Sequence, residues 1–492
     1  MGRMWTEDQL HAIEARGGSV LVSAAAGSGK TAVLVERLIR RITDRENPVD
    51  ADRFLVVTFT KAAAAEMRER VAARLRELLR ENPADGFLQH QMLLLERAQI
   101  CTIDSFFGSV VRENFEQLGV SPSLRVADET LLGRLRDEVL EDLLEQQYGL
   151  KEENFIRLVR YFGEENDNRL KAEMLKLYDK IRSLPFPFQW MEEQLIRYQS
   201  VAPVEETAWG RQLMQKVSQG VNYCQQVAKR ALFVLEADEG LLSAYAPACL
   251  SDLGQLEKLS GACEAGQWDG IYEALKEFSF TKLSRAPKDS DPTVKERFNA
   301  LRDMVKEEVK GFRKLLPCGN ADYLADLQAQ APLVEALFDL TKKFYQALDA
   351  EKQELNIGDF NDFAYLTLQL VSDEDGNPTS FAEEFSAQFE EILLDEYQDT
   401  NRLQDLIFRC ISRNGENLFL VGDLKQSIYR FRNADPAVFM EKKEAFSPYD
   451  GVHYPAFISL SKNFRSREGV TSGVNAVFEK LMTRELGNVT YN

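Results

Sequence analysis

Three carboxylates stand close together after an apolar stretch late in the chain. The run at 390–394 (EEILL) is followed directly by Asp395 and Glu396, and Asp399 lies a few residues further on. Two carboxylates about 4 Å apart repel each other by roughly 4 kcal/mol at an effective dielectric constant of about 20. The pattern therefore predicts a bound cation at this turn.

A glycine-bearing turn near the start of the chain is suited to hold a phosphate. The stretch AAAGSGKT at 24–31 lies between an apolar segment and an amphipathic helix. Small residues let backbone N–H groups approach a phosphate closely, and a helix N-terminus adds a favourable dipole. We expect the nucleotide phosphates to be held by Ala24, Ala25, Ala26, Gly27, Ser28 and Gly29. Lys30 would neutralise the β- and γ-phosphates, and the Thr31 hydroxyl would bind Mg²⁺. The leading glycine of the usual motif is Ala24 here.

The phosphate turn and the acidic turn are predicted to meet in space. Each follows an apolar segment that reads as a buried strand, and ligands of open parallel sheets bind beyond the carboxyl ends of the strands. Asp395 would then share the Mg²⁺ with Thr31, and Glu396 would orient or deprotonate the attacking water. The alternatives are a chance glycine turn before a helix and a solvated acidic turn.

Strands and helices alternate near both ends of the sequence, which indicates an α/β fold with a parallel sheet. The segment 61–80 is a strong helix by propensity. The expected strands are 19–23, 54–58, 99–103, 390–394, 417–421 and 457–461. We predict a RecA-like P-loop NTPase domain in two segments, 1–128 and 351–470, interrupted by an all-helical insertion at 129–350. Residues 471–492 would begin a further domain.

Composition narrows the class of protein. The net charge is −19, which argues against a general nucleic-acid coat protein but allows a local basic track. Six cysteines and three histidines are scattered, so neither a disulfide framework nor a zinc site is expected. The sequence has no apolar run long enough for a membrane span and no apolar signal region at its start. We expect a cytoplasmic protein.

The acidic turn, DEYQD at 395–399, resembles the D-E-x-Q-D box of superfamily 1 DNA helicases of the UvrD/RecB type. Further stretches resemble motifs of that family in the same order. TEDQ at 6–9 is similar to the Q motif, whose glutamine, Gln9 here, reads adenine; the alternative is a helix capping box, and both readings are compatible. LSKNFRS at 460–466 is similar to the motif whose arginine, Arg465 here, reaches the γ-phosphate. The resemblance also implies that Arg37 approaches the nucleotide.

Three other stretches resemble the family's DNA-contacting motifs. They are VTFTKAAA at 57–64, TIDSFF at 102–107 and LVGDLKQSIYRFR at 420–432. In the last of these the resemblance implies that Gln426 senses the γ-phosphate and couples it to the DNA. The implied DNA-binding residues are Phe59, Thr60, Lys61, Thr102, Ser105, Phe106, Tyr429, Arg430, Phe431 and Arg432.

Basic and aromatic residues in these stretches fit a sequence-tolerant track for single-stranded DNA. The helix at 61–80 carries six basic residues against three acids, and 424–432 carries three basic residues and no acid. For the helix taken alone, the alternative of a solvated charged face is favoured.

Within this family the chain is most similar to AddA-type helicase–nuclease subunits. That resemblance implies ATP and Mg²⁺ as cofactors, single- and double-stranded DNA as ligands, and a partner of the AddB type. It also implies a role in double-strand-break repair and recombination, and 3′ to 5′ movement. Motifs V and VI of the family are not found, so we expect the N-terminal part of a longer helicase, weakly active alone. Two alternatives stay open, a regulatory P-loop ATPase completed by a partner and a P-loop ATPase or kinase that does not act on DNA.

Overall fold

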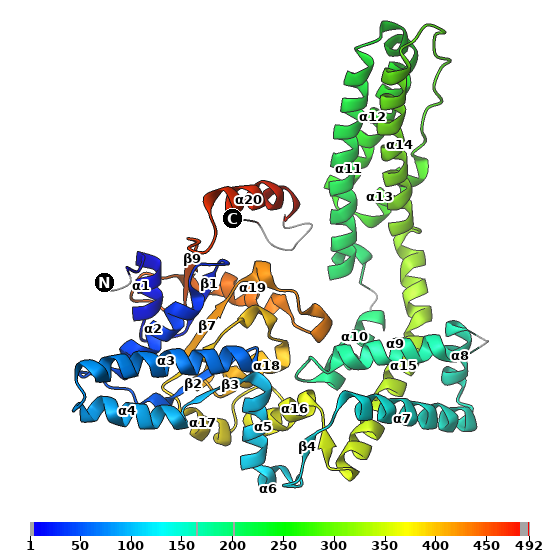
Figure 1. Cartoon of the computed structure of the whole chain (residues 1–492). Coiled ribbons are helices and arrows are strands. Elements are labelled where there is room, and N and C mark those ends of the chain that lie inside the picture. Colours follow the sequence, from blue (N-terminus) through cyan, green and yellow to red (C-terminus); the bar gives the residue numbers. More distant parts are fainter. Residues whose placement is uncertain (1–3, 164–165, 200–201, 483–490, 492) are drawn as a thin grey trace. The chain divides into compact units, whose positions relative to one another are not determined.

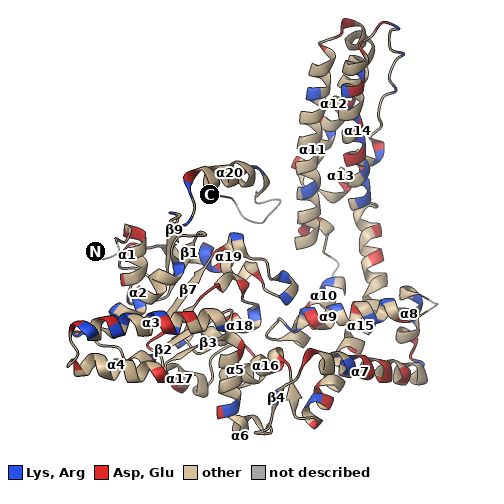
Figure 2. Cartoon of the chain, viewed as in Figure 1, with Lys and Arg blue, Asp and Glu red and all other residues tan. Residues whose placement is uncertain are grey.

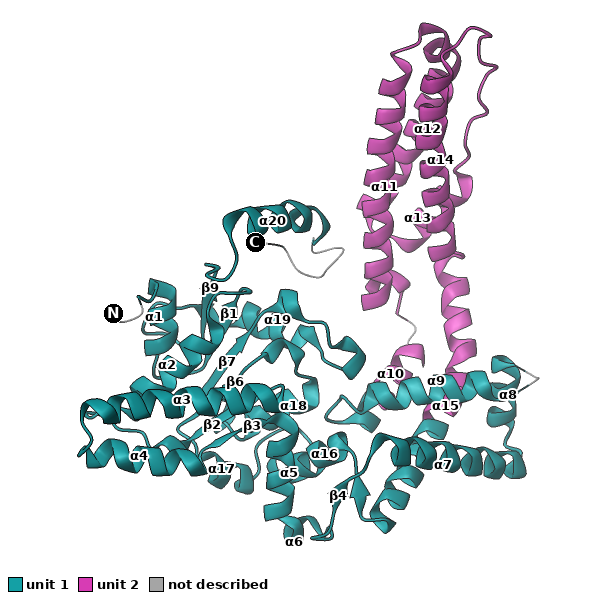
Figure 3. Ribbon diagram, viewed as in Figure 1, with its two compact units in different colours: residues 1–190, 339–492 teal, residues 191–338 magenta. Residues whose placement is uncertain are grey.

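A computed structural model describes residues 4–163, 166–199, 202–482 and 491 (Figure 1). The chain forms two compact units (Figure 3). Unit 1 comprises Met1–Trp190 and Asp339–Asn492, and unit 2 comprises Met191–Phe338. Of the helical insertion predicted for 129–350, residues 129–190 and 339–350 group with unit 1 and residues 191–338 form unit 2.

Unit 1 is built on a parallel sheet of seven strands. Their order is β3-β2-β6-β7-β1-β9-β8, and every pairing is parallel. The strands are β1 Val20–Ala24, β2 Phe54–Thr58, β3 Gln99–Thr102, β6 Glu391–Leu394, β7 Leu418–Gly422, β8 Ser447–Pro448 and β9 Ala456–Leu460. Six of them match the strands predicted from the sequence to within about one residue at each end. The expected α/β class with a parallel sheet is confirmed.

Alternate residues of each strand pack on opposite faces of the sheet, as the period of two requires. In β2, Leu55 and Val57 belong to one hydrophobic cluster, whereas Phe54 and Val56 belong to another. Both faces are buried, which explains why the strands read as continuous apolar runs.

Helices cover both faces of this sheet. The second cluster includes buried side chains of α1 Glu7–Glu14, α2 Lys30–Ile42, α3 Lys61–Glu81 and α4 Gly86–Arg97. The first includes side chains of α5 Ile103–Glu113, α16 Phe360–Val371, α17 Ser380–Ser386, α18 Arg402–Cys410 and α19 Pro436–Ala445. The result is a three-layer α/β/α arrangement.

The remaining elements of unit 1 are mainly helical. They are α6 Phe115–Leu118, α7 Glu129–Leu150, α8 Glu153–Phe162, α9 Asn168–Ile181, α20 Glu468–Leu481 and a two-stranded parallel sheet of β4 Arg125–Val126 and β5 Ile357–Gly358. Short 3₁₀ turns are η1 Ala51–Arg53, η3 Tyr397–Asp399, η4 Arg413–Gly415, η5 Leu424–Gln426 and η6 Arg430–Arg432. Part of the predicted segment 471–492, residues 483–490 and 492, lies outside the described residues.

Unit 2 is wholly helical in its described part. Its long helices are α11 Ala208–Leu235, α12 Glu239–Ala265, α13 Trp268–Glu277 and α14 Pro292–Leu315, with a short turn, η2 Val204–Glu206. Two helices, α10 Pro187–Gln199 and α15 Asn320–Glu354, run across the unit boundaries. A buried core containing Trp268, Phe312 and Leu256 holds the bundle together. Across the described residues of both units, we find no helix with the length and apolar character needed to span a bilayer.

Candidate nucleotide and nucleic-acid site

The predicted site residues gather at the carboxyl ends of the parallel strands, which we call the carboxyl edge of the sheet. Strands β6, β7 and β1 are neighbours in that order, and all run in the same direction. The turns that follow Ala24, Leu394 and Gly422 therefore leave the sheet at the same edge. This brings together segments that the sequence separates by more than half of the chain.

The phosphate turn between β1 and α2 has the backbone shape of an anion cradle. Gly27 and Gly29 have φ angles of 75° and 86°, in the left-handed region that favours glycine. A Cβ atom at Gly27 would lie 2.7 Å from Asn463 Oδ1 and 2.8 Å from Arg465 Cβ. Glycine is thus required at this position, and the backbone side of Arg465 lies beside the turn, while its reach to the γ-phosphate stays a prediction.

Lys30 and Glu396 form an ion pair across the site. The Lys30 Nζ atom lies 2.9 Å from Glu396 Oε2, with side-chain exposures of 13% and 34%. Glu396 has a φ angle of 53°, a left-handed conformation that is costly for a residue with a side chain. The lysine of the phosphate turn and the acidic turn after β6 therefore meet, as the sequence predicts.

The acidic turn carries more negative charge than Lys30 balances. Burial, followed by repulsion from Glu396, raises the pKa of Asp395 to about 6. The same two causes raise the pKa of Asp399 to about 6. Both carboxyl groups therefore bind protons more readily than an ordinary aspartate does.

This excess charge fits a magnesium nucleotide. Two buried oxygens, Ser28 Oγ and Asp399 Oδ1, have no hydrogen-bond partner within the described part of the chain. An unpaired hydroxyl in the phosphate turn and an unpaired carboxylate oxygen opposite are suited to a ligand that carries phosphate and a divalent cation. Thr31, the second residue of α2, and Asp395 are the side chains that could hold a metal ion.

A chain of hydrogen bonds leads from this ion pair to the next turn. Gln398 Nε2 donates to Glu396 Oε2 at 2.9 Å, and the N–H of Asp423 donates to Gln398 Oε1 at 2.9 Å. Gln426 Nε2 in turn donates to Asp423 Oδ2 at 2.7 Å. Lys30 and Gln426 are therefore connected through three intervening residues.

Gln398 and Asp423 are buried members of this chain to which the sequence patterns assigned no role. Their signal was present, since Gln398 stands in the DEYQD stretch and Asp423 in the stretch at 420–432. Gly422 leaves room for the link, because a Cβ atom there would lie 2.5 Å from Gln398 Oε1. The burial that gives both residues their importance is visible only in the fold.

Gln9 forms the capping box considered for it and also contacts the phosphate turn. Thr6 and Gln9 form a complete capping box at the start of α1. The Gln9 Nε2 atom also donates to Ser28 O in the phosphate turn at 2.9 Å. The side chain thus links the first helix to the nucleotide site, which leaves its reading of adenine as a prediction.

Four of the predicted DNA-binding side chains form an exposed aromatic and basic cluster. The rings of Phe59 and Tyr429 have centroids 4.6 Å apart, and those of Tyr429 and Phe431 are 5.7 Å apart. The Arg432 guanidinium lies 5.6 Å from the Tyr429 ring centroid. Phe431 is 76% exposed, so its face is open to a base. Arg430 and Lys61 are exposed nearby in sequence.

Phe106 is a correction to the expectation from sequence. Its side chain is 1% exposed and stacks with Phe408 in the core beneath the sheet, at a ring distance of 6.0 Å. It lies on the inward face of α5 and has no surface for DNA. Thr102 is nearly buried and caps this helix by accepting from the N–H of Ser105, while Ser105 itself is exposed.

The charges on α3 behave mostly as a solvated helix face. Acidic and basic residues alternate along it (Figure 2). Three of its six basic residues are paired with glutamates of the same helix, through Arg70–Glu66, Arg74–Glu77 and Arg76–Glu69. Arg68 donates to backbone carbonyls of the α4–β3 connection. Thr60 caps the helix by accepting from Ala63, and only the end near Lys61 adjoins the aromatic cluster.

Arg37 is a second correction, because the structure does not bring it to the nucleotide site. It lies seven residues beyond Lys30 on α2, which places it about 10 Å down the helix axis. Its side chain is 1% exposed and donates to Glu391 at the start of β6 and to Ala12 O. Arg37 thus lies at the amino ends of the parallel strands, which we call the amino edge of the sheet.

Comparisons with known proteins agree with this geometry. The family model described as the UvrD/REP helicase N-terminal domain matches residues 5–447. The A subunit of the ATP-dependent helicase/nuclease of Acetivibrio thermocellus is 40% identical over 501 residues, covering 99% of this chain and 40% of the relative. Proteins of the same name from Lachnoclostridium phytofermentans and Bacillus thuringiensis are 40% and 37% identical. They are covered over 36% and 40% of their length, so the chain spans about two fifths of these relatives.

Proposed function

Because the chain belongs to the UvrD/REP helicase family, we propose that it binds Mg²⁺-ATP at the carboxyl edge of its sheet and acts as an ATP-dependent DNA helicase. The resemblance to AddA-type subunits predicted from the sequence is confirmed by relatives that are about 40% identical across the whole chain. The names of those relatives describe a helicase and a nuclease. We propose only the helicase activity for this chain, because that is the activity its own residues support.

Nucleotide binding rests on an exchange of partners by Lys30. Its ammonium group neutralises Glu396 at 2.9 Å in the structure. A triphosphate entering the Gly27–Gly29 turn offers Lys30 a stronger anionic partner. Glu396 is then free to accept a proton from water, and Arg465 approaches the phosphates from the other side of the turn. Magnesium supplies charge neutralisation at the phosphate oxygens.

The hydrogen-bond chain from Lys30 to Gln426 is the single observation that carries the proposed coupling to DNA. Gln426 lies three residues before Tyr429, which stacks on Phe59 in the exposed cluster. A change at Glu396 is transmitted through Gln398 and Asp423 to the turn that presents these rings. Loss of the γ-phosphate would therefore alter the platform on which bases stack.

The test is the effect of single-stranded DNA on ATP hydrolysis. We expect DNA to stimulate hydrolysis by the wild-type protein. The variant Gln426→Ala should bind ATP as before and lose this stimulation. A P-loop kinase would ignore DNA, and an unchanged stimulation in Gln426→Ala would contradict the coupling.

The partner and pathway follow the relatives and belong to the same proposal. Because the relatives are named as the A component of a helicase/nuclease, their names imply at least one further component in those proteins. We propose an AddB-type partner for this chain, single- and double-stranded DNA as its ligands, 3′ to 5′ movement, and work in double-strand-break repair and recombination in the cytoplasm. Co-purification of the chain with a candidate partner, with and without a DNA end, tests this assembly.

A further inference from the structure

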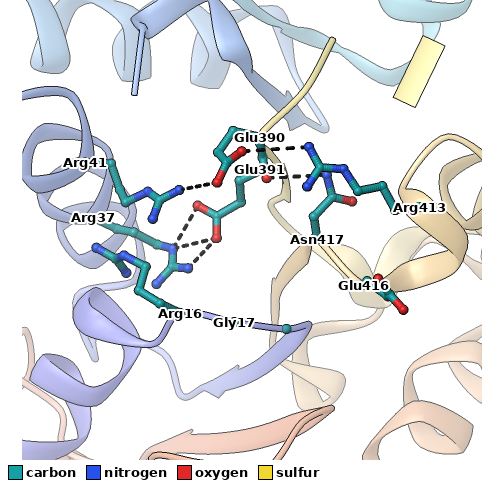
Figure 4. Close-up of a pocket in the computed structure, with 10 residues that line it drawn as sticks. Arg16, Gly17, Arg37, Arg41, Glu390, Glu391, Arg413, Glu416 and Asn417 are labelled. Carbon is teal, nitrogen blue, oxygen red and sulfur yellow. Dashed lines mark hydrogen bonds and ion pairs between the residues drawn. The ribbon is translucent and has the colours of Figure 1, made fainter. Parts of the chain in front are cut away.

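A pocket at the amino edge of the sheet is unusually rich in arginine. It has a volume of about 240 Å³ and lies at the opposite end of the strands from the nucleotide site. Its lining comes from the turn before β1, from α2, from the start of β6 and from η4 with the start of β7 (Figure 4). The arginines are Arg16, Arg37, Arg41 and Arg413.

The carboxylates of the pocket do not balance these arginines. Arg37 and Glu391 neutralise each other. Arg41 and Arg413 share a single carboxylate, Glu390, at 3.0 and 3.8 Å. The remaining lining carboxylate, that of Glu416, points away from the guanidinium groups (Figure 4).

Arg16 has no carboxylate partner within the described residues. Its Nη1 atom donates to Ile13 O and Ala15 O at the end of α1, and the residue lines the pocket. Burial, together with repulsion from Arg37, lowers the pKa of Arg16 to about 10. The four guanidinium groups of the lining therefore stand against three carboxylates, those of Glu390, Glu391 and Glu416, which leaves an excess of one positive charge.

Two polar atoms at the pocket also lack partners. Arg41 Nε and Asn417 Oδ1 are buried without a hydrogen bond to any described residue. The first is a donor and the second an acceptor. The Asn417 amide is fixed, because its Nδ2 donates to Phe389 O at 3.2 Å. A ligand that satisfies both must accept hydrogen bonds and donate one.

The backbone of η4 is held in an uncommon shape beside the pocket. Arg413, Asn414 and Gly415 have φ angles of 48°, 57° and 90°, all in the left-handed region. Two non-glycine residues in succession there are costly and occur where a side chain must be presented in a fixed place. Here the turn directs Arg413 toward Glu390.

We propose that this pocket is a binding site for a small phosphate-class anion. A dihydrogen phosphate monoanion matches the excess of one positive charge, accepts from the guanidinium groups of Arg16, Arg41 and Arg413, and donates an O–H to Asn417 Oδ1. The pocket is smaller than the usual range for drug-sized ligands, which suits an ion of this size. The site is separate from the phosphate turn at the other edge of the sheet.

The experiment measures thermal unfolding of the Lys30→Ala protein against inorganic phosphate at constant ionic strength. Lys30→Ala weakens phosphate binding at the nucleotide turn. We expect a saturable rise in Tm, and an apparent phosphate Kd about tenfold higher when Arg16→Gln is added, as loss of one charge-assisted hydrogen bond produces. Arg413→Gln is the second variant, because Arg16 also caps α1.

The matched control is Arg45→Gln in the same background. Arg45 is exposed, follows α2 and pairs with Asp85 away from the pocket, so its loss should leave the phosphate response unchanged. Phenyl phosphate, a phosphate monoester, is tested beside inorganic phosphate. Tighter binding of phenyl phosphate identifies a phosphate group attached to a larger molecule as the ligand, and tighter binding of inorganic phosphate identifies the free ion. No saturable rise with either, or a response that Arg16→Gln and Arg413→Gln leave intact, would overturn the proposal.

Discussion

Helix α2 places a cationic side chain near each edge of the sheet. Each cation forms an ion pair with a glutamate, and the two pairs differ in burial and in number of contacts. At the carboxyl edge Lys30 meets Glu396, just beyond the end of β6, through one contact between partly exposed groups. At the amino edge Arg37 meets Glu391, the first residue of β6, and is almost wholly buried. Arg37 also donates to a backbone carbonyl and lies over the Phe419 ring at 4.1 Å. Lys30 can exchange Glu396 for another anion, whereas Arg37 and Glu391 hold each other in place.

The difference shows how one helix and one strand serve both binding and stability. A lysine is a compact point charge on a flexible stem, and its partner Glu396 has a left-handed backbone conformation. An arginine fork satisfies a buried carboxylate with several hydrogen bonds in a fixed plane. We therefore expect changes at the first pair to affect nucleotide binding and changes at the second to affect folding.

The largest effect is expected for Arg37→Ala. It leaves the Glu391 carboxylate buried without its cation, which costs about 3–5 kcal/mol of unfolding free energy. Urea unfolding measures this loss. The double variant Arg37→Met, Glu391→Leu should recover most of it. If Arg37→Ala is as stable as the wild type, or if its folded fraction binds ATP less tightly, the Arg37–Glu391 pair does not serve folding alone.

Lys30→Ala should show the opposite pattern. Loss of a charge-assisted contact to the phosphates weakens ATP binding by about 10- to 100-fold, as about 1.5–3 kcal/mol implies. The unfolding free energy should change by no more than about 1 kcal/mol, because the pair with Glu396 is partly exposed. Titration with a fluorescent ATP analogue and urea unfolding of the same preparation measure both quantities. A destabilised protein with normal ATP affinity would contradict the account.

Phe431→Ala tests whether the exposed aromatic cluster at the carboxyl edge binds single-stranded DNA. Removing one stacking ring should weaken binding of single-stranded DNA by about 1–3 kcal/mol and leave ATP affinity unchanged. Fluorescence anisotropy with a labelled oligonucleotide provides the measurement. Ile428→Ala is the control, because Ile428 is also exposed (69%) but has no ring on which a base can stack. Equal losses in both variants would remove the stacking role.

The smallest effect concerns pH. The pKa of Asp395 and of Asp399 is raised to about 6, so these groups favour the folded state when protonated and lose that contribution as pH rises through 6. Magnesium requires the ionised forms. The Mg²⁺ concentration needed for ATP to raise Tm should therefore increase up to about tenfold per pH unit below 6. Asp395→Asn, run in parallel, corrects for protonation of ATP and should show a weaker dependence.

Sequence patterns predicted what depends on neighbouring residues. The strands, the phosphate turn and the capping box at Thr6 are local, and all appear in the structure. The pairing of Lys30 with the acidic turn also followed, because parallel strands end at a common edge. Phe106 was misplaced because a motif gives a residue's position along a helix but not the face that packs inward. Arg37 was misplaced because it lies about 10 Å along α2 from Lys30.

The rest depends on contacts between distant segments. Gln398 and Asp423 acquire their role only because η3 and β7 are adjacent. The arginine pocket draws on four separated stretches, none of which carries a recognisable motif alone. Its charge imbalance appears only when the partners of each guanidinium are known.

The most direct test of the central claim is amide hydrogen exchange with and without Mg²⁺-ATP. We predict slower exchange in the phosphate turn at 24–31 and in the acidic turn at 395–399, with no change at 411–417 beside the arginine pocket. Unchanged exchange at 24–31 and 395–399, or protection confined to 411–417, would contradict the assignment of the carboxyl edge as the nucleotide site.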